Sequence, residues 1–412
     1  MSSANEQFFA GVIEGFYGKP WTEAERFALF DWMAGWGLNT YLYAPKDDLK
    51  HRALWREAYS PTEEDALRKI VARCAGHKIR FIYSLSPGLD MRYQDAADIQ
   101  RVKDRFEQMR SLGCQNFAVL FDDIPTAPTA SVASEQARVA NALTRDSESL
   151  LFCPTVYCGR MAGKDYLLAL GRELAPETHI FWTGPEIISR EITVAHIQEL
   201  QETLRRKPLI WDNLHANDYD ARRFYCGPYS GRPTELRGEV TGFLVNPNCE
   251  FPLNFVPLRT FAQFVHDKGT WDARKAYLAA MREWFPRFAT IGEALTIEDL
   301  VLFGDCYYLP HGEGPEAETL LRGTFGKEAK RLRNSCTRIS DLRDRNLFYA
   351  LSRRAWELRE ELDLLIGYYE QLGAGTSRYH SGSHLPRIFR GGMVARLQRL
   401  LKQHEDGSFT HE

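Results

Sequence analysis

Two aspartates, Asp122 and Asp123, stand side by side directly after the apolar run FAVLF. Two carboxylates that leave a buried strand at the floor of a pocket suit acid–base chemistry, because their surroundings can keep one protonated and the other ionised. Neighbouring strand residues face opposite ways, so both acids serve one site only if the chain turns at Asp122, which Ile124 and Pro125 favour. A helix cap or a solvated turn is the alternative interpretation of such a pair.

Polar, glycine and aromatic residues also follow the other apolar runs of the N-terminal part. Aromatic rings pack against the apolar face of a sugar, while amides, a lysine and a carboxylate bond its hydroxyl groups. A single aromatic is more often core, and turns collect Gly, Asn and Asp for structural reasons, but the whole set favours a carbohydrate pocket. Its members are Gly15, Tyr17, Lys46, Tyr157, Trp211, Asn213, Asn217, Asp218, Tyr219, Asn246 and Asn248.

A metal-dependent hydrolase is the competing interpretation of acids at strand ends. Barrel metallohydrolases bind their metal through clustered histidines, and His215 is the lone histidine among the residues that follow these runs. The eight cysteines are scattered without a C-x-x-C pair, so we expect reduced core thiols rather than disulfides or a zinc site. The sequence therefore predicts neither a metal nor a cofactor.

An alternation of two kinds of segment must position these side chains. Short runs rich in aromatic and β-branched residues predict strands at 8–14, 40–44, 80–84, 116–121, 150–153, 179–183, 208–211 and 241–245. Stretches of helical period lie between them at 22–35, 62–76, 98–112, 131–143, 166–174 and 194–205. Thr62 with Asp65 resembles a capping box, which predicts the start of one helix.

This alternation predicts an α/β protein, a (β/α)₈ TIM barrel followed by a C-terminal α-helical domain. An open doubly wound sheet is the alternative, but it would want a glycine-rich phosphate turn that the spacing of Gly11, Gly15 and Gly18 does not match. The strand-like runs stop near Ala289, so we expect a catalytic barrel at 1–285 and a helical domain at 286–412. Within the latter, the pattern predicts a long helix at 341–372, a loop at 375–392 and a short helix at 393–403.

The overall composition is that of a folded globular protein, with 44% hydrophobic, 12% aromatic and 26% charged residues. A net charge of -3 gives no electrostatic case for nucleic acid or an anionic membrane as partner. No segment approaches the ~18 apolar residues of a membrane span, and the N-terminus lacks the features of a signal peptide. We therefore expect a soluble, cytoplasmic protein.

The segments that carry these residues resemble the catalytic blocks of glycoside hydrolase family 84, the O-GlcNAcases and related β-N-acetylglucosaminidases. They follow the family's order as GVIEGFYGKPW, WGLNTYLYAPKDD, SLSPGLD, LFDDI, CPTVYCG, WTGP, IWDNLHANDYD and NPNCEF. The resemblance implies a retaining hydrolase in which the substrate's own 2-acetamido oxygen attacks the anomeric carbon and forms an oxazoline. Such enzymes are an exception to the scheme with a carboxylate nucleophile.

The resemblance also implies a role for each site residue. Asp122 would orient and polarise the acetamido group, and Asp123 would be the general acid and then the general base. Val156, before Tyr157, departs from the acid expected in the animal enzymes, which leaves the aglycone contacts open. The remaining matches are Tyr157 and Asn213 near the acetamido group and the acid, Gly15, Lys46, Asp218 and either Asn246 or Asn248 at the sugar hydroxyls, and Trp211 and Tyr219 as pocket walls.

The function that the resemblance implies is hydrolysis of terminal β-linked GlcNAc, with Ser or Thr of proteins as the aglycone. A glycosidase of hyaluronan- or chitin-derived oligosaccharides is the alternative among enzymes. A non-catalytic sugar-binding module is the alternative from another class, and the presence of both Asp122 and Asp123 disfavours it. We expect a β-GlcNAc-bearing protein or glycan as partner, and a homodimer through the C-terminal helices stays open.

Overall fold

The computed structural model describes residues 8–144, 149–322, 325–373, 392–399, 401–403 and 409–411. The chain divides into two compact units. The first consists of Met1–Tyr219, Tyr229–Phe251 and Leu258–Asp272, and the second of Asp220–Pro228, Pro252–Pro257 and Ala273–Glu412. The second unit thus takes in residues 273–285, which the sequence analysis assigned to the barrel.

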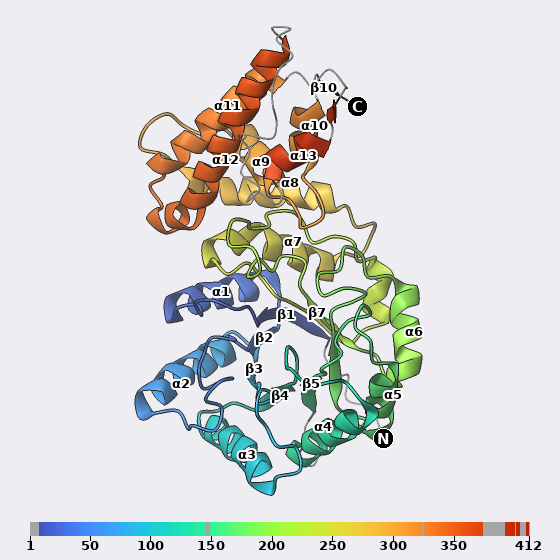
Figure 1. Ribbon diagram of the computed structural model, residues 1–412. Helices are drawn as coiled ribbons and strands as arrows, with labels where there is room; N and C mark the ends of the chain where they lie inside the picture. The colour runs from blue at the N-terminus through green and yellow to red at the C-terminus, as the bar shows by residue number, and fades with distance from the viewer. Residues whose placement is uncertain are drawn as a thin grey trace. The chain divides into compact units, whose positions relative to one another are not determined.

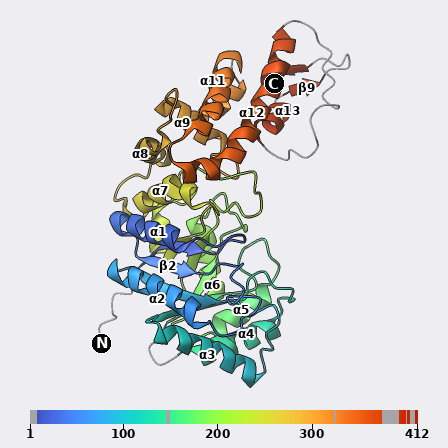
Figure 2. The same cartoon turned by 90° about the vertical axis from the view of Figure 1, so that its left-hand side faces the viewer.

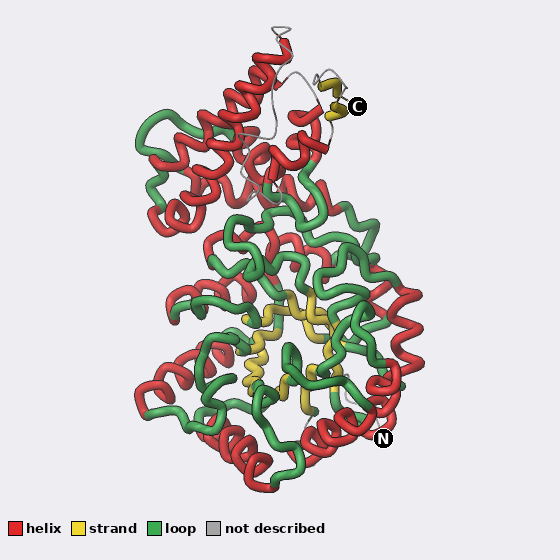
Figure 3. The backbone as a smooth tube through the Cα atoms, in the orientation of Figure 1, coloured by secondary structure: helices red, strands yellow, loops and turns green. Residues whose placement is uncertain are grey.

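Eight parallel strands close into a barrel in the first unit, and they form the inner ring of Figures 1 and 3. Val12 of the first strand lies opposite Tyr41 on one side and Val245 on the other, which closes the ring. All eight predicted strands are confirmed, as is the barrel fold. They are β1 Phe9–Glu14, β2 Thr40–Tyr43, β3 Arg80–Leu85, β4 Asn116–Leu120, β5 Leu150–Cys153, β6 His179–Trp182, β7 Leu209–Asp212 and β8 Gly242–Val245.

Apolar residues fill the inside of the barrel. Alternate residues of the strands, such as Ala118 and Leu120 of β4 or Leu151 and Cys153 of β5, belong to one buried cluster. The residues between them are buried as well, because helices cover the outside of the ring. Burial on both faces explains why the strands are continuous apolar runs rather than alternating ones.

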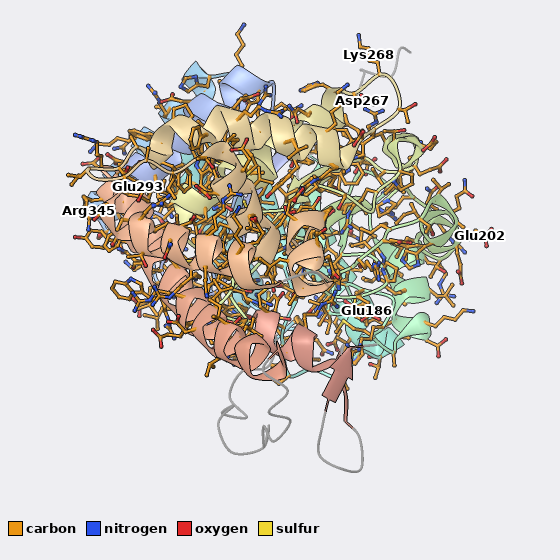
Figure 4. The ribbon with its side chains drawn as sticks, turned by 90° about the horizontal axis from the view of Figure 1, so that it is seen from above. Glu186, Glu202, Asp267, Lys268, Glu293 and Arg345 are labelled. Atoms are coloured by element: carbon orange, nitrogen blue, oxygen red, sulfur yellow. The ribbon has the colours of Figure 1, made fainter. Side chains whose placement is uncertain are left out.

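Helices follow the first six strands and surround the ring, with α1, α2 and α3 next to one another in Figure 2. The connection from β7 to β8, which is described throughout, contains the 3₁₀ helix η1 (Thr234–Gly238) in place of an α-helix, and α7 (Phe255–His266) follows β8. Figure 4 shows Glu202 of α6 projecting outward from this layer. The six helices are α1 Glu23–Trp36, α2 Pro61–Gly76, α3 Ala96–Ser111, α4 Ala130–Leu143, α5 Lys164–Glu173 and α6 Val194–Leu204.

The predicted start of α2 at Thr62 is wrong by one residue, because the helix begins at Pro61. Ser60 caps the helix instead, since the Glu63 side chain accepts the Ser60 amide at 2.7 Å while the Ser60 hydroxyl accepts the Glu63 amide at 3.5 Å. Pro61 occupies the first helical position, where no backbone N–H is needed and its fixed φ suits the helix. A capping box with the longer Glu therefore prevails over the Thr62 and Asp65 pair.

Helices make up most of the second unit, where α11 and α12 lie side by side. The predicted long helix is confirmed as α12, although it begins at Arg345, where the Leu347 amide donates to Asp344 at 3.0 Å. The predicted short helix is confirmed as far as Arg399, but 401–403 form a strand instead. The predicted loop lies outside the described residues apart from residue 392. The elements are α8 Ala273–Trp284, α9 Ile297–Cys306, α10 Pro315–Arg322, α11 Phe325–Arg338, α12 Arg345–Gly373, α13 Gly392–Arg399, β9 Leu401–Gln403 and β10 Phe409–His411.

The antiparallel pairing of β9 with β10 is the reason for the shorter last helix, because Leu401 and Gln403 are opposite His411 and Phe409.

All eight cysteines are free thiols, as predicted. In the described ranges, no helix has the length and apolar character needed to cross a bilayer.

Candidate active site

The strand ends bring the predicted residues to one end of the barrel. Because the strands are parallel and the ring is closed, the residues that follow them converge on one mouth. Each predicted residue lies within or after a strand: Gly15 and Tyr17 after β1, Lys46 after β2, Asp122 and Asp123 after β4, Tyr157 after β5, Trp211 in β7, Asn213, Asn217, Asp218 and Tyr219 after β7, and Asn246 and Asn248 after β8.

Asp122 is buried and half paired. Its Oδ2 lies 2.5 Å from the ammonium of Lys46, which is itself buried. Its Oδ1 is also buried and has no hydrogen-bond partner among the described residues. A buried acceptor without a donor costs roughly 1–3 kcal/mol. This oxygen can therefore accept one further N–H or O–H with a gain in stability.

Asp123 is the residue at which the chain turns, one position later than predicted. Its φ of 52° lies in the left-handed region, which Asp tolerates better than most residues. The side chain is exposed, and its Oδ1 accepts the Tyr157 hydroxyl at 2.7 Å while its Oδ2 accepts the Tyr17 hydroxyl at 3.0 Å. The turn therefore directs the second acid toward the aromatic side of the mouth.

The two tyrosines next to Asp123 are donors. Burial first, and then the negative charge of Asp123, raises the pKa of the Tyr17 and Tyr157 phenols well above the usual value. The charge of Asp122 contributes to both shifts, so both acids lie near both phenols. The phenols therefore stay protonated at neutral pH and hold their hydrogen bonds to Asp123.

Asp218 lies on the same side of the mouth. Its Oδ2 accepts the backbone N–H of Tyr17 at 2.9 Å, and the side chain is half-buried. Burial raises the pKa of Asp218, and the Tyr17 hydrogen bond opposes that shift. Through Tyr17, Asp218 is connected to Asp123.

Arg52 is the residue of this cluster that the sequence analysis missed. Its Nη1 donates to the Tyr17 hydroxyl at 2.6 Å, and its Nη2 donates to the Asp123 carbonyl at 2.8 Å. It lies further along the loop that begins with Lys46, beyond the residues that directly follow β2. The KDD segment before it indicates a polar loop, but the distance of Arg52 from the end of β2 gives no sequence signal for a place at the mouth.

Trp211 forms a wall that requires glycine at position 15. The indole is buried, with the Lys46 ammonium 5.4 Å from the ring centroid and Phe181 edge-on at 5.5 Å. A Cβ on Gly15 would lie 2.5 Å from Cζ2 of Trp211, closer than real Cβ contacts. Gly15 therefore serves the site by letting the indole approach the backbone of β1.

The asparagines join the last two strand ends. The Asn246 amide donates to the Asn213 Oδ1 at 3.0 Å, and the Asn213 amide donates to the Ile187 carbonyl at 2.9 Å. Within the described ranges, the buried Oδ1 of Asn246 has no hydrogen-bond partner. Asn248 is fully buried and Tyr219 is exposed. Both are placed at the mouth by their positions after β8 and β7.

The mouth can bind a polar ligand that has at least one N–H or O–H donor. Among the described residues, Asp122 has an acceptor oxygen without a partner, Asp123 has a carboxylate in reach of solvent, and Trp211 forms an apolar wall. In the part of the chain that the structure describes, no group of three or more His, Cys, Asp or Glu side chains could hold a metal ion.

Comparisons with known proteins agree with the barrel fold. A family model described as beta-N-acetylglucosaminidase matches residues 10–297. Protein O-GlcNAcase of Mus musculus and that of Rattus norvegicus are each 43% identical over 271 residues, which is 62% of this chain and 30% of each relative. The chain thus spans about a third of the length of these relatives. The solved structure of an O-GlcNAc hydrolase variant from Thermobaculum terrenum has a TM-score of 0.70 and 28% identity, covering 88% of this chain and 83% of that one.

The close contact at Gly15 predicts a sensitive position. Gly15→Ala is expected to lower the free energy of unfolding by about 1–3 kcal/mol, because the methyl group overpacks against Trp211. Denaturant unfolding measures the change. Gly35→Ala is the matched control in the same unit, since nothing lies within 4 Å of its added Cβ and the helix gains from Ala. Equal stability of Gly15→Ala and the wild type would show that Trp211 moves aside freely.

Proposed function

Because this chain belongs to the β-N-acetylglucosaminidase family, we propose that it is a retaining hydrolase of the O-GlcNAcase type, acting on terminal β-linked GlcNAc. The half-paired carboxylate of Asp122 is the observation that carries the proposal. One of its oxygens is neutralised by Lys46, and the other is buried without a donor among the described residues. The N–H of a 2-acetamido group is a donor that would complete this site.

The proposed reaction uses the substrate's acetamido group as nucleophile. Asp122 holds the acetamido N–H, so that the acetamido oxygen attacks the anomeric carbon. The bond to the leaving oxygen breaks as Asp123 gives that oxygen a proton, and an oxazoline forms as the acetamido N–H proton passes to Asp122, which returns it when the ring opens. Asp123 then takes a proton from water, whose oxygen opens the oxazoline at the anomeric carbon. Two inversions leave the configuration retained.

The other predicted residues bind the sugar in this proposal. Lys46, Asp218 and an asparagine after β8 bond the hydroxyls, and Asn246, whose Oδ1 has no partner among the described residues, is the better candidate for that asparagine. Asn248, which is fully buried, then has a structural role. Tyr157 and Asn213 lie at the acetamido group, Gly15 contacts the hydroxyls as well, and Trp211 and Tyr219 form the walls. We propose no metal or cofactor in these steps.

The aglycone is proposed to be Ser or Thr of a cytoplasmic protein. Its support is that the mammalian relatives, which this chain matches over part of their length, are named Protein O-GlcNAcase. The alternative substrates are oligosaccharides derived from chitin or hyaluronan. A homodimer through the C-terminal helices remains a proposal.

The two acids are expected to respond differently to substitution. Asp123→Asn should lower kcat/KM by ~10²–10⁴-fold for alkyl β-GlcNAc substrates and much less for a nitrophenyl substrate, whose leaving group needs no proton. Asp122→Asn should lower both alike, because the acetamido group must be oriented whatever leaves. Steady-state kinetics on both substrates measures this. Asp104→Asn, on the outside of α3, is the matched control.

Two outcomes would contradict this division of labour. Equal losses of Asp123→Asn on both substrates would remove its role as general acid. A loss by Asp122→Asn that depends on the leaving group would mean that the two roles are reversed.

Substrate assistance itself can be tested on the wild type. Successive fluorination of the N-acetyl group should slow hydrolysis stepwise, because fluorine withdraws electrons from the attacking oxygen. A thiazoline analogue of the intermediate should bind more tightly than GlcNAc. The matched β-glucoside, which lacks the acetamido group, should not be hydrolysed. A rate indifferent to fluorine, or a glycosyl ester trapped on an Asp or Glu, would refute the mechanism.

The aglycone is tested by comparing natural substrates. If Ser- or Thr-linked GlcNAc is the substrate, kcat/KM should be higher for a GlcNAc-modified protein than for chitin- or hyaluronan-derived oligosaccharides. Release of free GlcNAc measures all three reactions. Faster release from an oligosaccharide would assign the enzyme to glycan breakdown.

A further inference from the structure

We propose that Arg52 is a positioning residue that orients the carboxylate of Asp123 for proton transfer, acting through the Tyr17 hydroxyl and the Asp123 carbonyl. The proposal rests on the proposed function, in which Asp123 gives its proton to the leaving group. It assigns a role to a residue outside the predicted site.

The guanidinium of Arg52 connects two loops of the mouth. Its two terminal nitrogens donate to the Tyr17 hydroxyl at 2.6 Å and to the Asp123 carbonyl at 2.8 Å. Its central carbon lies 5.3 Å from the centroid of the Tyr17 ring, which adds a cation–π contact. Arg52 thus holds both the backbone of Asp123 and a side chain that touches its carboxylate.

A guanidinium can only donate, so the Tyr17 hydroxyl accepts from Arg52. The ionised form of Asp123 can only accept, so in that form its Oδ2 takes the Tyr17 proton. The Tyr157 hydroxyl donates to the other oxygen, Oδ1. Both carboxylate oxygens are therefore oriented by phenols, and Arg52 fixes the more exposed phenol.

The bond to the carbonyl acts on the backbone of Asp123. This residue has a φ of 52°, a conformation that a non-glycine residue keeps only when its surroundings hold it there. Arg52 can serve as an anchor because its neighbour His51 is tied to β3, with Nδ1 at 2.9 Å from the Ser84 carbonyl and its own carbonyl accepting the Ser86 amide at 2.9 Å. The turn that aims the second acid is therefore braced from the end of β3.

A purely structural role of Arg52 and a role in orienting Asp123 predict different losses of activity on different substrates. If Arg52 only stabilised the fold, its loss would reduce activity by one factor on every substrate. If it orients Asp123, the loss should fall on substrates that need the proton, because a small misplacement of an acid impairs proton transfer strongly.

The experiment compares Arg52→Met with the wild type on alkyl and nitrophenyl β-GlcNAc. We expect kcat/KM for the alkyl substrate to fall by about tenfold more than that for the nitrophenyl substrate. Arg52→Lys, which keeps the charge but not the fork, should be intermediate. Arg101→Met, on the exposed face of α3, is the matched control and should match the wild type on both substrates.

A double-variant cycle tests the route through Tyr17. Tyr17→Phe should show the same preference for the nitrophenyl substrate to a smaller degree, and the double variant should be no worse than Arg52→Met alone. Strictly multiplied losses would overturn the route. Equal losses of Arg52→Met on both substrates, with an active wild type, would overturn the proposal while leaving the proposed function intact.

A wild type that hydrolyses neither substrate would instead refute the proposed function and, with it, the role of Arg52. If Arg52→Met fails to fold in a thermal melt, Arg52→Lys and Tyr17→Phe decide the question by the same comparison of substrates. An unchanged ratio of the two rates in both variants would overturn the proposal.

Discussion

Closure of the parallel strand ring is the constraint on which the site depends. The pairing of β1 with β8 brings the first and last segments of the barrel together. Only because of this pairing can Gly15, near the start of the chain, lie against Trp211 of β7, and the Tyr17 amide bond Asp218. The same geometry sets the ends of β7 and β8 side by side, where Asn213 accepts from Asn246. The mouth is thus assembled from residues far apart in sequence.

Buried acids at strand ends fall into two kinds in this barrel. Glu14 accepts hydrogen bonds from two nitrogens of Arg26 and from the Trp21 amide. Asp212 likewise accepts from two nitrogens of Arg232 and from the Tyr229 hydroxyl. Complete pairing offsets the cost of burying these charges and leaves them no capacity for a ligand. Asp122, by contrast, has a partner among the described residues on one oxygen only. Incomplete hydrogen bonding, rather than burial or charge, distinguishes Asp122 from Glu14 and Asp212.

The left-handed backbone conformation of Asp123 lets the second acid face the same mouth as Asp122. Without it, adjacent residues would face opposite sides, and the two acids would not share one mouth. Such a turn is unfavourable by itself, so the contacts of Asp123 with Arg52, Tyr17 and Tyr157 have to hold it. The same small group of side chains thus holds the strained backbone of Asp123 and orients its carboxylate.

The sequence by itself determined the strands, the barrel and the position of the acids, because these follow from local runs of buried residues and from what comes directly after them. It also indicated the start of α2 closely, but not the choice between Ser60 and Thr62, which depends on the reach of Glu63 and the fixed φ of Pro61. Only the tertiary structure decided that one oxygen of Asp122 has no partner in the described part of the chain and that Arg52 holds Asp123. Both are contacts between different loops, and pairing across loops leaves no periodic trace in the sequence. The local pattern can place a charged residue at the mouth, but its partner is settled only when the ring closes.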